Sequence, residues 1–391
     1  MHNNSISKLL NLKDIIVKNI SHSDSKVLIY IETTKKFSCC PSCSSLTNRV
    51  HDYRPQKIKD FPIMYKDTFL ILRKRRYACS CGKRFYENYD FLPKFSRMTN
   101  RLVSYIIEEL RNSVPFTLVA KKSNLSTTTV SRIFDYVNYS KPLKLPEALS
   151  IDEFKGNSGG HKYQCILVDP VKRKILDILP TRYQCDLINY FKQYSRQERC
   201  KVKFFICDMW RTYAELAKVF FPNAAIIVDK YHFIRQVSWA LENVRKNVQK
   251  TMPANLRKYY KRSKRLLTKP SYKLNTEEKA EVKLMILYNE NLRRAYILKE
   301  RFYELCHENK YEKQRKAFSK WIEMAENSGI VEFKKCTKTF HNWSKEILNA
   351  FKYGYTNGPT EGFNNKIKVI KRVSYGILNF NRLRNKILHQ Y

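Results

Sequence analysis

The stretch KFFICDMWRTYAELAKVFFPNAAIIVD, residues 203–229, decides the fold class of this chain. It holds two short apolar runs, and an aspartate directly follows each of them, Asp208 and Asp229. Apolar runs of this length are typical of buried strands. Residues 211–221, between the runs, carry apolar side chains at helical spacing. The stretch therefore predicts a strand, a helix and a second strand, the alternation found in α/β proteins.

Three further apolar runs precede this stretch, at residues 148–154, 163–168 and 174–179. Asp169 and Pro170 separate the second run from the third and indicate a hairpin turn. Residues 185–194 have the pattern of an amphipathic helix. Three antiparallel strands followed by a helix, a strand, a helix and a strand give the order of a ribonuclease H-like fold. In that order Asp152 lies on the first strand, and Asp208 ends the fourth, its neighbour in the sheet.

A second informative stretch is NGPTEGFNNK, residues 357–366. Asn-Gly-Pro cannot continue a helix, and Pro359 or Thr360 can begin the next one, which places Glu361 in its first turn. A carboxylate followed on one helix face by amides and cations suits a metal ion beside a phosphate backbone. The spacing alone leaves open a second interpretation, an exposed capped helix with a solvated basic face. The residues that share the face with Glu361 are Asn364 or Asn365, Lys368 and Arg372.

The chain of 391 residues is strongly basic, with 75 lysines and arginines against 35 acidic residues and a net charge of +40. Such an excess destabilises a compact state by self-repulsion and indicates a polyanionic partner, of which nucleic acid is the leading candidate. We expect no membrane partner, because no apolar run approaches the roughly 18 residues that a spanning helix needs. The N-terminus lacks the pattern of a secretory signal. A cytoplasmic, nucleoid-associated protein is therefore expected.

Four of the eleven cysteines form two close pairs near the N-terminus. Without an export signal, clustered cysteines indicate a metal site before a disulfide. Two pairs joined by a small sheet predict a zinc-ribbon-like module with a tetrahedral sulfur site for Zn²⁺. Buried free cysteines are the alternative, and the single residue between the cysteines of the second pair departs from the usual ribbon spacing. The predicted zinc ligands are Cys40, Cys43, Cys79 and Cys81.

A helix-turn-helix is predicted between residues 96 and 140. Apolar residues repeat at helical spacing, and Ser126 can cap a second helix over 127–136. The second helix of such a motif enters the major groove of DNA. The predicted DNA contacts are Thr127, Thr128, Ser131 and Arg132 on that helix, Arg73, Arg75 and Arg76 before the second cysteine pair, and Asn364, Asn365, Lys368 and Arg372 on the helix of Glu361.

Asp152, Asp208 and Glu361 are the candidate catalytic residues. Three carboxylates without a positive partner repel one another, so their gathering requires divalent cations. Hard oxygen ligands with open positions select Mg²⁺ or Mn²⁺, and two such ions support an in-line displacement at phosphorus. Asp229 and His232 are candidates for supporting the metal ligands. The alternative is that Asp229 caps the following helix and that His232 packs locally.

Residues 235–347 have a helical, highly charged pattern and predict an all-α insertion. The insertion separates a first part of the core, residues 147–234, from a last part, residues 348–391. An all-α block at this position can cover DNA. Its tryptophans, for which core packing is expected more than stacking on bases, are Trp239, Trp321 and Trp343.

The chain resembles the DDE transposases of the ISL-three group of bacterial insertion sequences over nearly its whole length. The resemblance rests on the cysteine pairs, the helix-turn-helix and the motifs SIDEF (150–154), FICD (205–208), VDKYH (228–232) and NGPTEGFNN (357–365). It implies that Asp152, Asp208 and Glu361 form the catalytic triad. The implied activity is cleavage of double-stranded DNA at the terminal inverted repeats of the element, followed by strand transfer into target DNA. A homodimer on DNA is also implied, because two ends must be held together.

The predicted organisation is a zinc-ribbon-like module at 1–95, the helix-turn-helix at 96–140, and a ribonuclease H-like core interrupted by the all-α insertion. Two other functions compete with transposition. A non-catalytic DNA-binding regulator would use the ribbon and the helix-turn-helix alone, but it has no use for spaced carboxylates. A ribonuclease H-like junction nuclease would share the chemistry, but it would not need the two DNA-binding modules.

Overall fold

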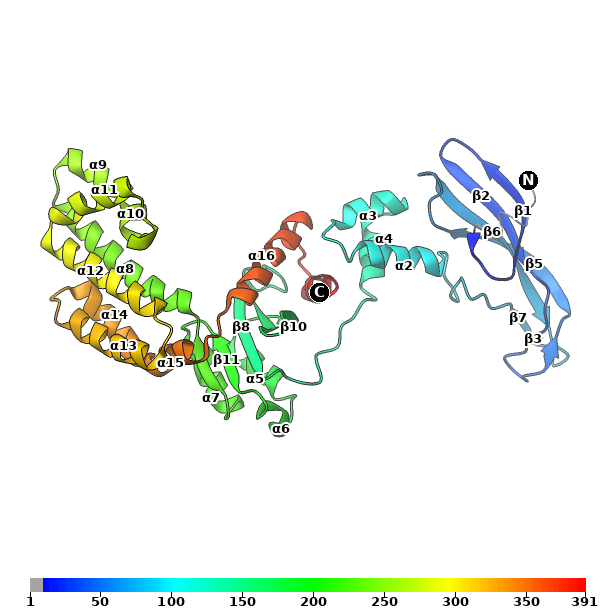
Figure 1. Ribbon diagram of the computed structural model, residues 1–391. Helices are drawn as coiled ribbons and strands as arrows, with labels where there is room; N and C mark the ends of the chain where they lie inside the picture. The colour runs from blue at the N-terminus through cyan, green and yellow to red at the C-terminus, as the bar shows by residue number, and fades with distance from the viewer. Residues whose placement is uncertain (1–9) are drawn as a thin grey trace. The chain divides into compact units, whose positions relative to one another are not determined.

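The computed structural model describes residues 10–391 (Figure 1). The chain divides into two compact units, Met1–Ser140 together with Ile367–Tyr391, and Lys141–Lys366. The first unit contains the cysteine pairs and the helix-turn-helix, and the second contains the candidate catalytic residues. Within the described residues, no helix combines the length and the apolar character needed to span a bilayer.

The N-terminal module is a five-stranded sheet with its own hydrophobic core. Its strands are β1 (Ile15–His22), β2 (Lys26–Thr33), β5 (Val50–Lys59), β6 (Asp67–Ala78) and β7 (Arg84–Tyr86). The order is β1-β2-β6-β5 with β7 on β6, and β2 and β6 pair in parallel whereas the other neighbours are antiparallel. Leu70 and Leu72 on β6 are fully buried, because alternate side chains of a strand face the same core. The sequence predicted only a small sheet here, so this five-stranded sheet is larger than expected.

The helix-turn-helix lies in three helices, α2 (Asn100–Glu109), α3 (Phe116–Ser123) and α4 (Thr127–Phe134). Asn124 ends α3 in the left-handed conformation, with φ of 52° and ψ of 48°, which asparagine tolerates better than most residues. The Ser126 hydroxyl then accepts a hydrogen bond from the backbone N–H of Thr129 at 3.1 Å and caps α4. The predicted turn and cap are both present.

The C-terminal helix α17 (Phe380–Leu388) packs against this helix-turn-helix. The ammonium group of Lys386 is buried and donates hydrogen bonds to the carbonyls of Leu110 and Asn112, just beyond α2. Arg382 forms an ion pair of 2.6 Å with the aspartate that ends α4. These contacts add a fourth helix to the DNA-binding motif, which was not predicted from the sequence.

The second unit begins with a mixed five-stranded sheet. Its strands are β8 (Ala148–Phe154), β9 (Gln164–Asp169), β10 (Lys174–Leu179), β11 (Phe204–Cys207) and β12 (Ala225–Val228). The order is β10-β9-β8-β11-β12: the first three are antiparallel, and β8, β11 and β12 are parallel. The connecting helices are α5 (Gln184–Phe191), α6 (Arg196–Arg199) and α7 (Arg211–Phe220). The predicted pairing of the first strand with the fourth is therefore confirmed.

A block of helices follows β12. It comprises α8 (Lys230–Lys250), α9 (Ala254–Arg262), α10 (Lys264–Thr268), α11 (Thr276–Leu287), α12 (Glu290–His307), α13 (Tyr311–Glu326), α14 (Val331–Asn342) and α15 (Ser344–Tyr353), with a 3₁₀ turn at Ser271–Lys273. The Trp321 ring is buried in it and donates to the Leu298 carbonyl at 2.7 Å, and Trp343 is also buried. Trp239 is 46% exposed, so the expectation of core packing is wrong for this residue.

Gly354 ends α15 in the left-handed conformation, with φ of 70°. Helix α16 (Gly358–Val373) then begins within the NGPTEG motif, and Glu361 lies in its first turn as predicted. The backbone N–H of Glu361 donates to the Asn357 carbonyl at 2.9 Å, which is the helical i to i+4 bond.

Candidate active site

Parallel pairing of β8 with β11 brings two of the predicted catalytic residues to one edge of the sheet. Ile206 pairs with Ser150, so Asp208 and Asp152 follow two residues further along neighbouring strands. Both side chains point to the same face, because side-chain direction repeats every two residues. Burial and the negative charge of Asp208 raise the pKa of Asp152 to about 7. Two carboxylates are thus close enough to resist simultaneous ionisation.

His232 lies beside Asp208, in the first turns of α8. Its Nε2 atom is 3.1 Å from Oδ1 of Asp208. Burial disfavours the charged imidazolium, but the hydrogen bond to Asp208 and the attraction of the surrounding carboxylates outweigh this and raise the pKa of His232. The histidine therefore contacts a candidate catalytic carboxylate.

Asp229 caps helix α8 and also anchors the NGPTEG motif. Its Oδ2 atom accepts from the backbone N–H of Tyr231 at 3.1 Å, and Oδ1 accepts from the backbone N–H of Asn357 at 2.9 Å. The capping role was the alternative interpretation from sequence. The hydrogen bond from Asn357 connects the residue before α16 to the residue that follows β12.

The side chain of Asn357 makes two further contacts with the sheet edge. Its Nδ2 atom lies 3.4 Å from Oδ1 of Asp208, and its Oδ1 atom accepts a short hydrogen bond from the Ser150 hydroxyl. The Ser150 and Thr360 hydroxyls also bond to each other at 2.9 Å. Ser150 and Thr360 were not among the site residues predicted from sequence. Their positions next to the two acidic motifs, on a buried strand and a helix start, were the available signal.

About two turns beyond Asn357, Asn364 on α16 reaches the other aspartate. Its Nδ2 atom donates to Oδ2 of Asp152 at 2.8 Å. The oxygen of the same amide is buried, and no described group donates to it. Asn357, Glu361 and Asn364 follow at steps of four and three residues, so they lie on one face of the helix. Glu361 thus lies between two asparagines that contact the two aspartates.

The three carboxylates do not form a closed ligand set. In the described part of the chain, only the four cysteines gather three or more metal-binding atoms within 4.8 Å of one another. Glu361 is exposed, whereas Asp152 is buried. The structure therefore brings Asp152 and Asp208 together, whereas Glu361 is exposed in the first turn of α16.

The cysteine pairs form the predicted sulfur cluster. Sγ of Cys40 lies 3.7 Å from that of Cys81, and Sγ of Cys43 lies 3.5 Å from that of Cys79. A tetrahedral Zn²⁺ with Zn–S bonds of about 2.3 Å keeps its sulfurs about 3.8 Å apart, so these separations fit zinc. Gly82, with φ of +86°, closes the turn after the short Cys79–Cys81 spacing, which therefore does not prevent tetrahedral geometry. The two small strands of this region are β3 (Ser38–Cys39) and β4 (Leu46–Thr47).

The predicted DNA contacts differ in their exposure. Arg75 is buried, and its guanidinium donates to Thr33 and pairs with Glu87 at 3.3 Å, so the expectation that it contacts DNA disagrees with its position inside the module. Arg73 is exposed and stacks on Tyr53. Asn364 is also buried, against Asp152. The remaining predicted contacts are at least partly exposed: Arg76, Thr127, Thr128, Ser131, Arg132, Asn365, Lys368 and Arg372.

Comparison with protein families agrees with this architecture. A family described as "Transposase" of the ISL3 type matches residues 149–387, which include both aspartates and the NGPTEG motif. The chain belongs to the ISL3 family of transposases. Two shorter models of this family match as well. The zinc finger of the IS204/IS1001/IS1096/IS1165 transposases covers residues 36–81, and the helix-turn-helix domain of the ISL3 transposases covers residues 87–138.

One relative of this transposase is similar over most of its length. The transposase for insertion sequence element IS1001 of Bordetella parapertussis is 27% identical over 359 residues, which are 89% of this chain and 87% of that protein. An ATP-dependent protease of Lactococcus lactis is 30% identical over 88 residues, 22% of this chain and 28% of that protein. The second match is too short to bear on the transposase core.

Proposed function

We propose that this transposase binds the terminal inverted repeats of an insertion sequence and catalyses Mg²⁺-dependent strand cleavage and strand transfer. Asp152, Asp208 and Glu361 are its catalytic carboxylates in this proposal. The observation that carries it is the pair of amide contacts, Asn357 to Asp208 and Asn364 to Asp152, on either side of Glu361. A helix that served only as a solvated basic face would have no reason to bury an amide against a strand aspartate.

The residues at this edge fit a divalent cation. Burial and Asp208 raise the pKa of Asp152, so a cation bound at this edge would stabilise its ionised form. Carboxylate oxygens are the ligands that Mg²⁺ and Mn²⁺ prefer. When bound, a pair of such ions supplies activation of a water or 3′-hydroxyl and stabilisation of the leaving oxygen.

The side chains around the carboxylates keep them in place. Asn364 orients Asp152, while His232 and Asn357 share one oxygen of Asp208 and leave the other to a ligand. Glu361 is exposed and has three rotatable bonds, so it can join the aspartates by a rotamer change while its helix stays anchored.

The strand order supports a ribonuclease H-like core in this proposal, with α8–α15 as an all-α insertion between β12 and the helix of Glu361. The exposed side chains of α4 would face the major groove. A homodimer on DNA would hold two transposon ends together.

A cleavage assay on DNA carrying the terminal repeats tests the proposal. Asp208→Asn and Glu361→Gln should each bind the DNA as the wild type does and lose at least about 10³-fold in Mg²⁺-dependent cleavage, because each removes a ligand to the ions that stabilise the transition state. Glu147→Gln, an exposed glutamate outside the site, is the matched control. Cleavage retained by Asp208→Asn would reject the assignment. A wild type that binds the repeats without cutting them would support the regulator.

A further inference from the structure

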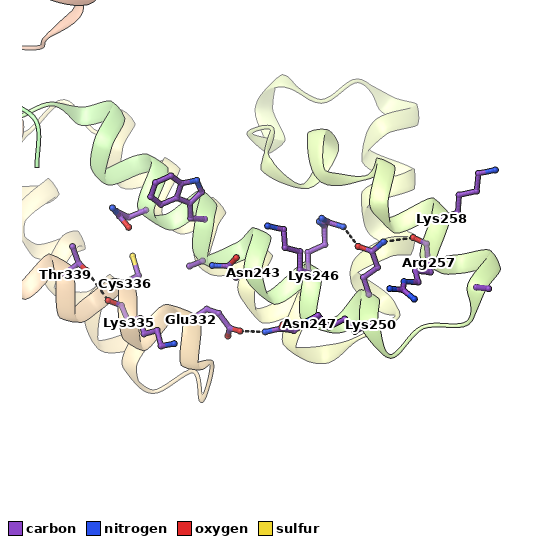
Figure 2. Close-up of a pocket in the computed structure, with 16 residues that line it drawn as sticks. Asn243, Lys246, Asn247, Lys250, Arg257, Lys258, Glu332, Lys335, Cys336 and Thr339 are labelled. Carbon is purple, nitrogen blue, oxygen red and sulfur yellow. Dashed lines mark hydrogen bonds between the residues drawn. The ribbon is translucent and has the colours of Figure 1, made fainter. Parts of the chain in front are cut away.

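The helical block contains a basic groove that the candidate active site does not use. It has a volume of about 1090 Å³ and is lined by α8, α9 and α14 (Figure 2). One face of α8 supplies Trp239, Asn243, Lys246 and Lys250 at helical spacing. Helix α9 and helix α14 supply the opposite walls. All of these residues belong to the second compact unit.

Cations dominate the lining of this groove. Five exposed basic side chains line it: Lys246, Lys250, Arg257, Lys258 and Lys335. Of these, Lys246 approaches Glu242 at 3.9 Å, whereas no described acidic group forms an ion pair with the other four. A sixth cation, Arg245, is buried and paired with Glu242 at 2.8 Å, so it stabilises the wall instead of facing a ligand.

The single acidic residue of the lining does not offset this charge. The carboxylate of Glu332 accepts a hydrogen bond from Nδ2 of Asn247 at 2.7 Å, which joins α14 to α8 (Figure 2). Amide side chains fill much of the remaining wall, and Gln249 donates to the carbonyl of Arg257 at 2.7 Å. A concave surface of cations and amides matches a chain of phosphates separated by polar sugars.

An aromatic side chain also lines the groove. Trp239 is 46% exposed, unlike the two buried tryptophans of the same block. The guanidinium of Arg235 stacks on its ring at 4.1 Å from the centroid, which keeps the ring in place. Exposed tryptophan beside a cationic groove is a combination that DNA-binding surfaces use for contacts to sugars and bases.

We propose that this groove is a second DNA-binding surface, which takes the sugar–phosphate backbone of DNA outside the segment read by the helix-turn-helix. The inference rests on the proposed function to the extent that it assumes DNA substrates with transposon ends. Its role is to position the substrate, because none of the lining residues belongs to the candidate active site.

A charge-neutralising variant tests this surface. Lys250→Gln, Arg257→Gln and Lys335→Gln together remove one cation from each of the three helices. The control carries Lys279→Gln, Lys283→Gln and Lys316→Gln, which are exposed on α11 and α13 outside the groove and have the same total charge change. Hydroxyl-radical footprints on DNA with a terminal repeat and long flanks, without Mg²⁺, are compared with affinities over a salt series.

We expect the groove variant to lose protection over one flanking segment while it keeps the segment bound by the helix-turn-helix. The slope of the logarithm of its DNA association constant against the logarithm of the salt concentration should become less negative by about 2.7, which is about 0.9 for each of the phosphates that the three cations no longer neutralise. The control variant should have the same slope as the wild type. An unchanged footprint, or an equal loss in the control, would overturn the inference. Cleavage by the wild type is measured separately. If the wild type does not cleave the DNA but the groove variant still has a shortened footprint, the proposed function is rejected and the inference about the groove stands.

Discussion

At the scale of single residues, carboxamides give the candidate site its shape. Asn357 and Asn364 contact Asp208 and Asp152 respectively, and the structure buries both amides. An amide is neutral, so it can donate to a carboxylate without neutralising the charge that a metal ion requires. A lysine at either position would supply the positive partner itself and compete with the metal.

The first prediction concerns Asn364. Asn364→Ala should lower the rate of Mg²⁺-dependent cleavage by roughly 10- to 100-fold, the usual effect of removing a residue that orients a metal ligand. The Mg²⁺ concentration for half-maximal rate should rise, while affinity for repeat DNA stays unchanged. Val369→Ala, an exposed residue of the same helix, serves as the control. A fall in DNA affinity without a change in Mg²⁺ dependence would mean that Asn364 contacts DNA instead.

The second prediction follows from the pKa of Asp152, which burial and Asp208 raise to about 7. In the metal-free protein, Asp152 of the unfolded chain loses its proton near the ordinary aspartate pKa of 3.8, whereas the folded chain keeps the proton up to about pH 7. The free energy of unfolding therefore falls as pH rises from about 4 to about 7. Asp152→Asn removes that effect. The melting temperature of the variant minus that of the wild type should therefore increase as pH rises across this range. Saturating Mg²⁺ should reduce this difference. A difference that is independent of pH would contradict the assignment.

At the scale of elements, the zinc site and the sheet beside it have separate sources of stability. The four cysteines lie on turns next to β3 and the ends of β6, whereas β1, β2, β5 and β6 bury an apolar core. A metal site can supply much of the folding free energy of a small module. Because this sheet has its own apolar core, we expect zinc to stabilise mainly the turns that carry the cysteines.

The third prediction tests this separation. Cys79→Ser should reduce the zinc content measured by mass spectrometry and speed amide exchange at residues 38–47 and 78–86, since these turns lose their shared ligand. Exchange in β1, β2 and the first half of β6 should stay slow. Cys185→Ser, an exposed cysteine outside the cluster, is the control. Rapid exchange throughout the sheet would show that zinc supports the whole module.

Sequence patterns predicted elements well where local chemistry determines them. Asn124 and Ser126 specify the turn before α4, and apolar runs that end in Asp208 and Asp229 specify two buried strands. Contacts between distant segments were missed. A lysine in the sequence FNRLRNKIL gives no local sign that its ammonium group becomes buried against carbonyls more than 270 residues earlier. The exposure of Trp239 was missed for the same reason, because burial depends on which helices pack around it.

At the scale of the whole molecule, one segment of chain serves both compact units. Helix α16 begins beside the candidate catalytic aspartates, and the chain from Ile367 onward belongs to the unit that contains the helix-turn-helix. The DNA-reading motif is therefore completed by residues that follow the catalytic motif in sequence. The three helices α2, α3 and α4 of this motif are expected to depend on a fourth for their stability.

The fourth prediction tests that dependence through Lys386. Burial lowers the pKa of Lys386 to about 8, so the side chain is still charged at pH 7 and its burial is costly. Its removal relieves that cost but leaves the buried carbonyl of Leu110 without this donor, at about 1–3 kcal/mol. The carbonyl of Asn112 still accepts hydrogen bonds from Val114 and Gln390. We expect the loss at Leu110 to outweigh the relief, because an ammonium that keeps its proton is already compensated by its bonds. Lys386→Ala should therefore speed amide exchange in α2–α4 and weaken binding to repeat DNA, with α8–α15 unchanged. Lys121→Ala, on the exposed side of α3, controls for the change in charge. Equal rates of amide exchange in α2–α4 of the two variants would show that the motif does not need the contacts of Lys386.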